Sequence, residues 1–326
     1  MIRRATFDPR ATRFQTGHPS FKEKNDFLSA LSYKKPKSLF QLILSLRYPD
    51  FDFDNEAIDV LRVKRAQLYD ALKQQLEELK PSLQHTGAFE VKETQSQSAT
   101  KKWLVIRALH CSAQPSRRIA HFETEKAKMN FLRGHLWGMN KVTTKAMAYG
   151  KRNEQHARKK YAEEQLKTDI TAVVQECGLF LNTEYVGLSC SPDGIKESQM
   201  HIYPRTLLEI KCIYSLRNHD PNQFEVILTP KKLKNFCLKR EESGELSLKK
   251  DHQYYDQIQF SMGLLDLPEC HLFLWTNVNS ITICVPFDEG RWLELKESLT
   301  AFHWEYLAPE YFAMRAPREL EPKRIE

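Results

Sequence analysis

The sequence is short of three features that mark large classes of protein. Its 326 residues include 11 glycines, none in a glycine-rich phosphate loop, so nucleotide-binding folds built on such loops are disfavoured. Its seven cysteines are odd in number and contain no C-x-x-C pair. This pattern predicts neither a disulfide framework nor a structural zinc site, and it favours a reducing, intracellular compartment. The longest apolar stretches, SLFQLILSL and HLFLW, are too short to cross a bilayer, so we expect no membrane partner.

The first residues, MIRRATFDPRATRF, lack the apolar segment of a secretory signal peptide, which predicts a non-secreted protein. They are rich in arginine and poor in acids, so a mitochondrial transit peptide stays open. The run KKPK at 34–37 leaves a nuclear address open if the source is eukaryotic, although so short a basic run is more often solvated surface.

The charge balance is mildly basic. Lys and Arg number 49 against 42 acids, for a formal net charge of +7. This excess is compatible with a polyanionic partner, but many soluble proteins share it. The length, with 41% hydrophobic residues, is ample for a packed core and suits one large domain with an extension.

The chain is expected to divide at about residue 95. Leucines recur at helical spacing over 67–84, which predicts a helix closed near Pro81. Residues 86–102, TGAFEVKETQSQSATKK, hold few apolar side chains and are typical of a linker or mobile loop. We therefore predict a helical N-terminal extension of unknown role, 1–95, and a main domain, 96–326.

Helical and strand patterns alternate in the main domain. Residues 129–170 are predicted to be mostly helical, with a potential break at Gly150. Residues 178–195 and 206–212 are predicted to be strands with a turn between them, and 251–267 a helix. Residues 271–287 are predicted to form two strands, and 290–307 a closing helix. This interleaving predicts a mixed α/β fold.

The strand LLEIKC carries an acid and a base within an apolar run. Because side chains alternate along a strand, Glu209 and Lys211 share one face and Ile210 takes the other. Asp193, in SPDG, ends a preceding strand, and pairing of the two strands would bring it to Glu209. Two carboxylates and a lysine at a strand edge suit Mg²⁺ or Mn²⁺. An isolated E-x-K pattern, however, is more often a surface ion pair.

The order of several motifs changes that reading. GKRNEQHARKKY, SPDGI, LLEIKC, HQYYDQIQFSMG, LFLWT and VPFDEGRW follow one another over about 103–292. In this order and spacing the sequence resembles the YqaJ-type viral recombinase family and the related phage lambda exonuclease, within the PD-(D/E)XK nuclease superfamily. The resemblance implies a restriction-endonuclease-like core, a mixed central sheet flanked by helices. Residues 1–95 are not covered by it.

The resemblance also implies roles for single residues. Asp193 and Glu209 correspond to metal ligands, joined by the backbone carbonyl of Ile210, and Lys211 to the lysine beside the attacking water. Glu154 matches the family's helix acid in G-x-x-x-E-x-x-A and would act on the metal directly or through water. Without the resemblance, Glu154 reads as a solvated acid paired with a basic residue four positions later.

The family's Q-x-Q pattern matches Gln257 and Gln259, which are expected to be catalytic. On a helix the two side chains point in different directions, so we expect one of them to face the site. The neighbouring His252 and Tyr255 are candidates for phosphate contact, with helix capping and packing as an equally weighted alternative. Arg158, in the basic run of the Glu154 helix, is a further candidate for contact with DNA.

A W-x-x-x-R motif in this family leads into a stretch that holds the DNA 5′ phosphate. Trp103 and Arg107 keep the motif here, but the ungapped register puts Gln114 where serine is usual, and Ser112 lies two positions early. We expect Arg107, Ser112 and Gln114 to be phosphate ligands. The departure at Gln114 places end specificity in doubt more than the chemistry.

The implied activity is Mg²⁺-dependent hydrolysis of DNA, with Mn²⁺ as a substitute. The expected form is a 5′-to-3′ exonuclease on double-stranded DNA ends, acting in recombination, repair or mobile-element processing, and the phage relative suggests a homotrimer. Lysine-rich runs near the motifs suit a nucleic-acid backbone. A degenerate nuclease fold that serves as a DNA-binding scaffold, and an endonuclease, stay open as alternatives.

Overall fold

The computed structural model describes residues 87–139 and 143–313. The helices are α4 (Lys101–Ala108), α5 (Ser116–Ala120), α6 (Glu125–His135), α7 (Lys145–Thr168), α8 (Phe224–Ile227), α9 (Pro230–Lys234), α10 (Gln253–Leu265), α11 (Glu289–Phe302) and α12 (Ala308–Ala313), with short 3₁₀ turns at Gln97–Ala99, Tyr214–Leu216 and Pro221–Gln223 and a π-helical turn at His303–Leu307. No helix within these residues combines the length and apolar character that crossing a bilayer requires.

The strands form two main sheets and a small ribbon. They are β1 (Ala88–Glu90), β2 (Cys111–Ser112), β3 (Val173–Gln175), β4 (Phe180–Asn182), β5 (Leu188–Cys190), β6 (Gly194–Glu197), β7 (Arg205–Cys212), β8 (Leu238–Arg240), β9 (Leu246–Leu248), β10 (Glu269–Trp275) and β11 (Ser280–Pro286). One sheet has the order β11-β10-β7-β6-β3, the other β1-β4-β5-β2, and β8 pairs with β9. The five-stranded sheet is mixed, since β7 and β10 are parallel and its other pairs antiparallel.

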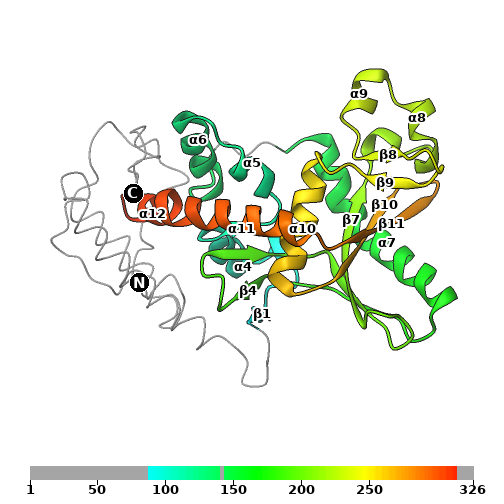
Figure 1. Ribbon diagram of the computed structural model, residues 1–326, viewed down its shortest axis with the longest axis horizontal. Helices are drawn as coiled ribbons and strands as arrows, with labels where there is room; N and C mark the ends of the chain where they lie inside the picture. The colour runs from blue at the N-terminus through cyan, green and yellow to red at the C-terminus, as the bar shows by residue number, and fades with distance from the viewer. Residues whose placement is uncertain (1–86, 140–142, 314–326) are drawn as a thin grey trace, which may run out of the picture.

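Strand β7 is buried on both faces because helices cover both (Figure 1). Leu207 packs in the larger core together with Ile258 of α10, whereas Leu208 and Ile210 pack with Tyr161 of α7. A strand buried on both sides reads as a continuous apolar run rather than an alternating one. This arrangement confirms the predicted mixed sheet flanked by helices.

Two local predictions differ from the structure. Residues 86–102 are not a loose linker where the structure describes them, because β1 pairs with β4 and Phe89 and Thr94 are fully buried. The prediction was wrong because it relied on the scarcity of apolar residues in this segment, whereas a few buried side chains suffice to hold a short strand. Helix α7 continues through Gly150 without a break. The predicted helix at 67–84 lies outside the described residues, so the domain boundary near residue 95 stays a prediction.

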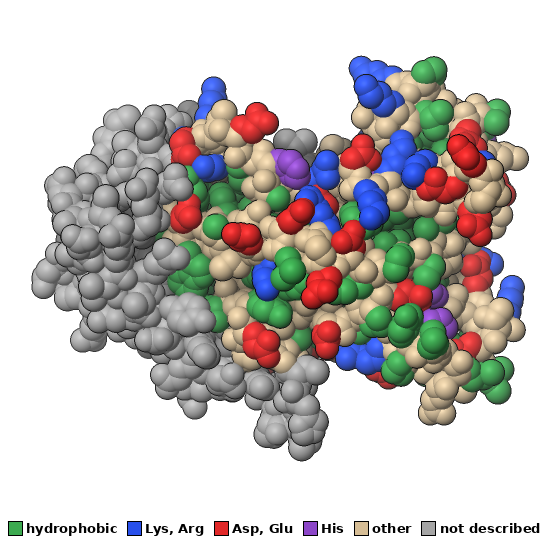
Figure 2. All heavy atoms as spheres, in the orientation of Figure 1, with side chains coloured by type: hydrophobic (Ala, Val, Ile, Leu, Met, Phe, Trp, Pro, Cys, Tyr) green, Lys and Arg blue, Asp and Glu red, His purple; other side chains and the backbone are tan. Residues whose placement is uncertain are grey.

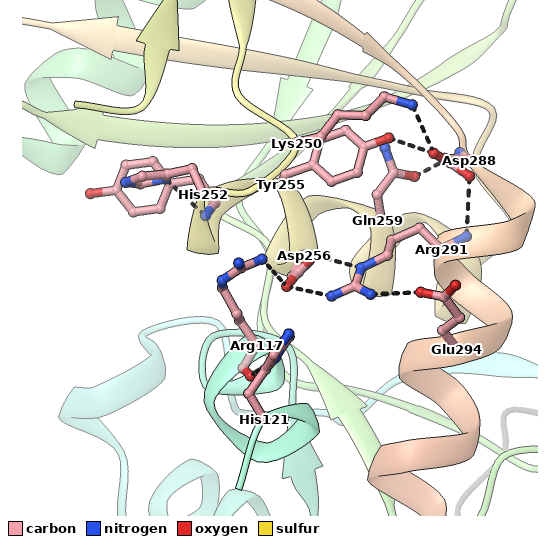
Figure 3. A network of polar contacts seen from close by, with 11 residues as sticks. Arg117, His121, Lys250, His252, Tyr255, Asp256, Gln259, Asp288, Arg291 and Glu294 are labelled. Carbon is pink, nitrogen blue, oxygen red and sulfur yellow. Dashed lines mark hydrogen bonds and ion pairs between the residues drawn. The ribbon is translucent and has the colours of Figure 1, made fainter. Parts of the chain in front are cut away.

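A buried carboxylate fixes helix α10 against its neighbours (Figure 3). Asp256 is fully buried and accepts two hydrogen bonds of 2.8 Å from the Nε and Nη2 atoms of Arg291 on α11. Arg117 of α5 donates a third, at 3.1 Å. The pair with Asp256 raises the pKa of Arg291. Such paired, charge-assisted bonds set the orientation of α10 as well as its position.

Replacing Asp256 with asparagine should lower the free energy of unfolding by about 2–3 kcal/mol, because charged hydrogen bonds to two arginines are lost in a buried position. The matched control is Glu294→Gln, which removes an exposed partner of the same Arg291 and should cost under about 1 kcal/mol. Denaturant titration measures both. Equal losses in the two variants would contradict the structural role of Asp256.

Candidate active site

The β6–β7 hairpin brings Asp193 to the edge of β7. In its register Gly194 lies opposite Leu208, so Asp193, one residue before β6, reaches the next part of β7. Its Oδ2 atom accepts a hydrogen bond of 2.6 Å from the backbone N–H of Ile210. The N–H and C=O of a residue in an antiparallel pair point to the same side. We therefore expect the Ile210 carbonyl at this edge as well.

Glu209 lies at the centre of the site. Its side chain is 2% exposed, and its Oε1 atom accepts hydrogen bonds from Lys211 Nζ and from Gln257 Nε2 of α10. Lys211 Nζ also lies 4.7 Å from the centre of the Tyr254 ring. The acid and base that share one face of LLEIKC are thus neighbours in a buried site and not an exposed surface pair.

Helix α7 adds Glu154 to this group. Arg158, one turn later, donates from Nη2 to Glu154 Oε1 at 3.0 Å and from Nε to the backbone carbonyl of Asp193 at 2.9 Å. Its Nη1 lies 3.0 Å from Glu176. Arg158 therefore ties α7 to the loop before β6, and its three donor groups are engaged within the protein. That arrangement gives Arg158 a positioning role.

Burial is the main cause of raised pKa values in the three carboxyl groups. Burial, followed by the charge of Asp193, raises the pKa of Glu154 to about 7. Burial also raises the pKa of Glu209 to about 7, partly offset by Lys211, and it raises the pKa of Asp193. Burial lowers the pKa of Lys211, but the charges of Glu209 and Asp193 outweigh it and raise that pKa overall, so the lysine is cationic.

These residues fit a divalent cation. Three carboxyl groups with raised pKa values meet two cations here, Lys211 and Arg158, and Arg158 is shared with Glu176, so the acids outnumber the cations. Their donors are all hard oxygens, the type that Mg²⁺ and Mn²⁺ prefer. The predicted ligands Asp193, Glu209, Ile210 and Glu154 would hold the ion, and Lys211 lies beside them.

The two predicted glutamines take different directions. Gln257 faces Glu209, whereas Gln259 donates to the backbone carbonyl of Pro286 at 2.9 Å and accepts from the Asp288 N–H. Gln259 thus joins α10 to the end of β11 and does not join the carboxylate cluster (Figure 3). The expectation that one of the pair faces the site agrees with this geometry.

The predicted phosphate contacts at the start of α10 are engaged in hydrogen bonds within the protein. Tyr255 donates from its hydroxyl to Asp288 Oδ2 at 2.7 Å, and His252 caps the helix by accepting from the Tyr254 N–H at 3.1 Å. Sequence reasoning named Tyr255 but missed Tyr254, whose ring contacts the lysine. Helical spacing was the available signal, because residues 254 and 257 are three apart and share a face.

Arg107 is half-buried on α4. Its guanidinium lies 5.1 Å from the centre of the Trp103 ring, and Trp103 donates to Ser191 Oγ at 2.8 Å, two residues before Asp193. Burial lowers the pKa of Arg107 to about 10, and no carboxylate pairs with it among residues 87–139 and 143–313. A guanidinium that is partly removed from water and pairs with no described carboxylate is suited to bind an anion.

The other two predicted phosphate ligands differ from each other. Ser112 is buried on β2, and its hydroxyl makes no hydrogen bond to any described residue. Gln114, in contrast, is exposed on the loop before α5. Strand β2 contacts α4, the helix of Arg107. Ser112 therefore keeps an unused hydroxyl in the strand next to α4, whereas Gln114 lies on the surface.

The mixed sheet flanked by helices thus carries a carboxylate–lysine cluster at the edge of β7. The family model of the YqaJ-like viral recombinase domain matches residues 91–266. The chain therefore belongs to the YqaJ-like viral recombinase family, which confirms the resemblance seen in the sequence.

Comparison with solved structures finds similar exonucleases. The alkaline exonuclease LHK-Exo from Laribacter hongkongensis is 22% identical with a TM-score of 0.44, covering 62% of this chain and 90% of that chain. The Shutoff and Exonuclease Protein from Kaposi's sarcoma-associated herpesvirus is 13% identical with a TM-score of 0.42, covering 94% of this chain and 98% of that chain. A comparison with curated proteins finds no match.

In the presence of a chelator, the free energy of unfolding should fall as pH rises from about 5 to about 7. Unfolded glutamates lose their protons near pH 4.5, whereas folded Glu154 and Glu209 hold theirs to about pH 7. The folded state therefore binds more protons in this window, and raising the pH favours unfolding. Glu154→Gln should flatten the slope, and Glu163→Gln, at an exposed position on the same helix, should not. Identical slopes in the two variants would refute the raised pKa of Glu154.

Proposed function

We propose that this protein is a metal-dependent DNA nuclease that hydrolyses phosphodiester bonds, using Mg²⁺ with Mn²⁺ as a substitute. The observation that carries the proposal is the convergence of Asp193, Glu209, Lys211 and Glu154 at one edge of β7. When bound there, a divalent cation would supply an activated water and neutralise charge on the phosphate.

Side chains of the protein would orient the metal ligands and set the electrostatic charge of the site. Lys211 is held cationic between Glu209 and the face of Tyr254, so it can stabilise the negative charge that develops on the phosphate. Gln257 fixes one oxygen of Glu209 and so aims the carboxylate. Arg158 holds the backbone at Asp193 against α7. Each contact pre-orders a group before substrate arrives, which limits the reorganisation that the reaction requires.

The surface near the site suits a DNA backbone. Figure 2 shows Lys and Arg side chains on the α8–α9 part of the molecule and along the hollow between this part and α5 and α6. On α9, Lys231, Lys232 and Lys234 are exposed and form no ion pair with the residues that the structure describes. Unpaired lysines are free to neutralise phosphates and release counterions.

Exonuclease action from a 5′ end is the form of the activity that we propose, on double-stranded DNA. The guanidinium of Arg107, which pairs with no described carboxylate, and the unbonded hydroxyl of Ser112 support recognition of a terminal phosphate. Trp103, whose ring contacts Arg107, donates to Ser191, close to Asp193 in the chain. We also propose a homotrimer and a role in recombination, repair or mobile-element processing, which rest on the family resemblance.

With Mg²⁺, the purified protein should degrade linear duplex DNA. Lys211→Ala or Asp193→Asn should slow this degradation by at least about 100-fold, because Lys211 stabilises charge on the reacting phosphate and Asp193 holds the metal ion that does the same. Lys167→Ala, on the exposed end of α7, is the matched control and should cut normally. A gel assay of product against time measures this, and DNA binding without divalent ions should change little. Undiminished cutting of DNA by both site variants would contradict the proposed mechanism.

Wild-type protein should prefer a 5′-phosphorylated end over a 5′-hydroxyl end, and Arg107→Gln should abolish that preference. Arg205→Ala, at an exposed position on β7, is the control. The rates on the two ends measure the effect. Covalently closed circular DNA should resist cutting, and its degradation would show an endonuclease instead. Equal rates on both ends in the wild type would refute terminal-phosphate recognition.

A further inference from the structure

The opposite face of the five-stranded sheet carries a second group of metal-ligating side chains. Glu269 and His271 are two residues apart on β10, and Cys284 of β11 is the cross-strand partner of His271. One ligand atom from each lies within 4.8 Å of the others. Because Glu209 is in register with Leu272, this group points away from the catalytic face.

The distances within the group suit a tetrahedral ion. Nε2 of His271 is 3.3 Å from Oε1 of Glu269, and Sγ of Cys284 is 2.8 Å from Oε2 of the same carboxylate. Nitrogen and oxygen ligands around a tetrahedral zinc ion lie about 3.4 Å apart, given their bond lengths. The nitrogen–oxygen spacing already matches that value, and the thiol would need to move outward by less than about 1 Å.

The imidazole of His271 is oriented toward the group. The hydroxyl of Tyr161, on α7, lies 2.6 Å from Nδ1 of His271. This contact at one ring nitrogen fixes the plane of the ring and leaves Nε2 facing Glu269. Histidines that bind metals commonly use their second nitrogen in such a contact.

Glu269 lacks a donor for one of its oxygens. The residue is 9% exposed, and its Oε1 atom accepts no well-aligned hydrogen bond from any described residue. Burying such an acceptor without a partner is costly. His201, from the loop between β6 and β7, places Nε2 3.8 Å from this oxygen, and the buried Lys196 interacts with the carboxylate by charge alone. Glu269 Oε1 thus lies among His271, His201 and Lys196 without a well-aligned hydrogen bond, a position in which a bound cation would serve as its partner.

We propose that Glu269, His271 and Cys284, with His201 as the fourth ligand, bind one zinc-class divalent ion. A thiolate and imidazoles select such an ion over Mg²⁺, which prefers oxygen alone. The ion would join the loop before β7 to the β10–β11 hairpin. Through Tyr161 it would also steady α7, the helix that carries Glu154. This site does not depend on the proposed nuclease activity.

Titration with Co²⁺ tests the site, because a thiolate ligand gives cobalt a charge-transfer absorption that a site made of oxygens cannot give. The full chain with Asp193→Asn, which weakens the catalytic carboxylate cluster, should develop this absorption at one Co²⁺ per chain, and Zn²⁺ should displace it. Adding Cys284→Ser should abolish the band. Adding Cys237→Ser instead, which changes a buried thiol elsewhere in the core, should leave it intact.

A second measurement guards against loss of folding in the variants. Zn²⁺ should raise the melting temperature of the Asp193→Asn protein, since a ligand that binds only the folded state stabilises it, and should not do so once Cys284→Ser is added. No cobalt band, or an unchanged band in the Cys284→Ser protein, would overturn the site. So would equal stabilisation of both proteins by Zn²⁺. Nuclease assays with Mg²⁺ are unaffected by either result and judge the proposed function separately.

Discussion

The buried carboxylate of Glu209 is the constraint around which the active site is arranged. Its position in the centre of the sheet removes it from water, and such burial is tolerated only when charge and hydrogen bonds compensate. Lys211 and Gln257 supply that compensation from β7 and α10. The helix that brings Gln257 must therefore lie in one orientation against the sheet. The Asp256 network with two arginines fixes that orientation from the other side of α10.

Compensation of Glu209 is incomplete, and this gives the site its chemistry. Asp193 and Glu154 add negative charge to the same edge, and the pKa values of both glutamates rise to about 7. A site whose three carboxyl groups outnumber its two cations, Lys211 and Arg158, favours a divalent cation. Stability of the metal-free protein and affinity for the ion are thus opposed, as is common where function requires a charged cluster.

The two faces of one sheet present two different donor sets. Glu209 and Lys211 face α10, while His271 and Cys284 lie on the face that α7 covers. Hard oxygens gather on the first face and a thiol with imidazole on the second, so the faces select different ions. Helix α7 links them, since it contributes Glu154 to one and Tyr161 to the other.

The sequence by itself determined the mixed α/β order, the shared face of Glu209 and Lys211, and the family, because strand alternation and motif order are local properties of the chain. It did not determine which side chains of α10 face the site. Tyr254 and Gln257 do and Tyr255 and Gln259 do not, because the rotation of a helix depends on what packs against it. The second donor set was also hidden, since cysteine spacing argued against zinc. Residues 269, 271 and 284 meet only when β10 pairs with β11, and the loop before β7 adds His201 beside Glu269, so tertiary structure alone brought them together.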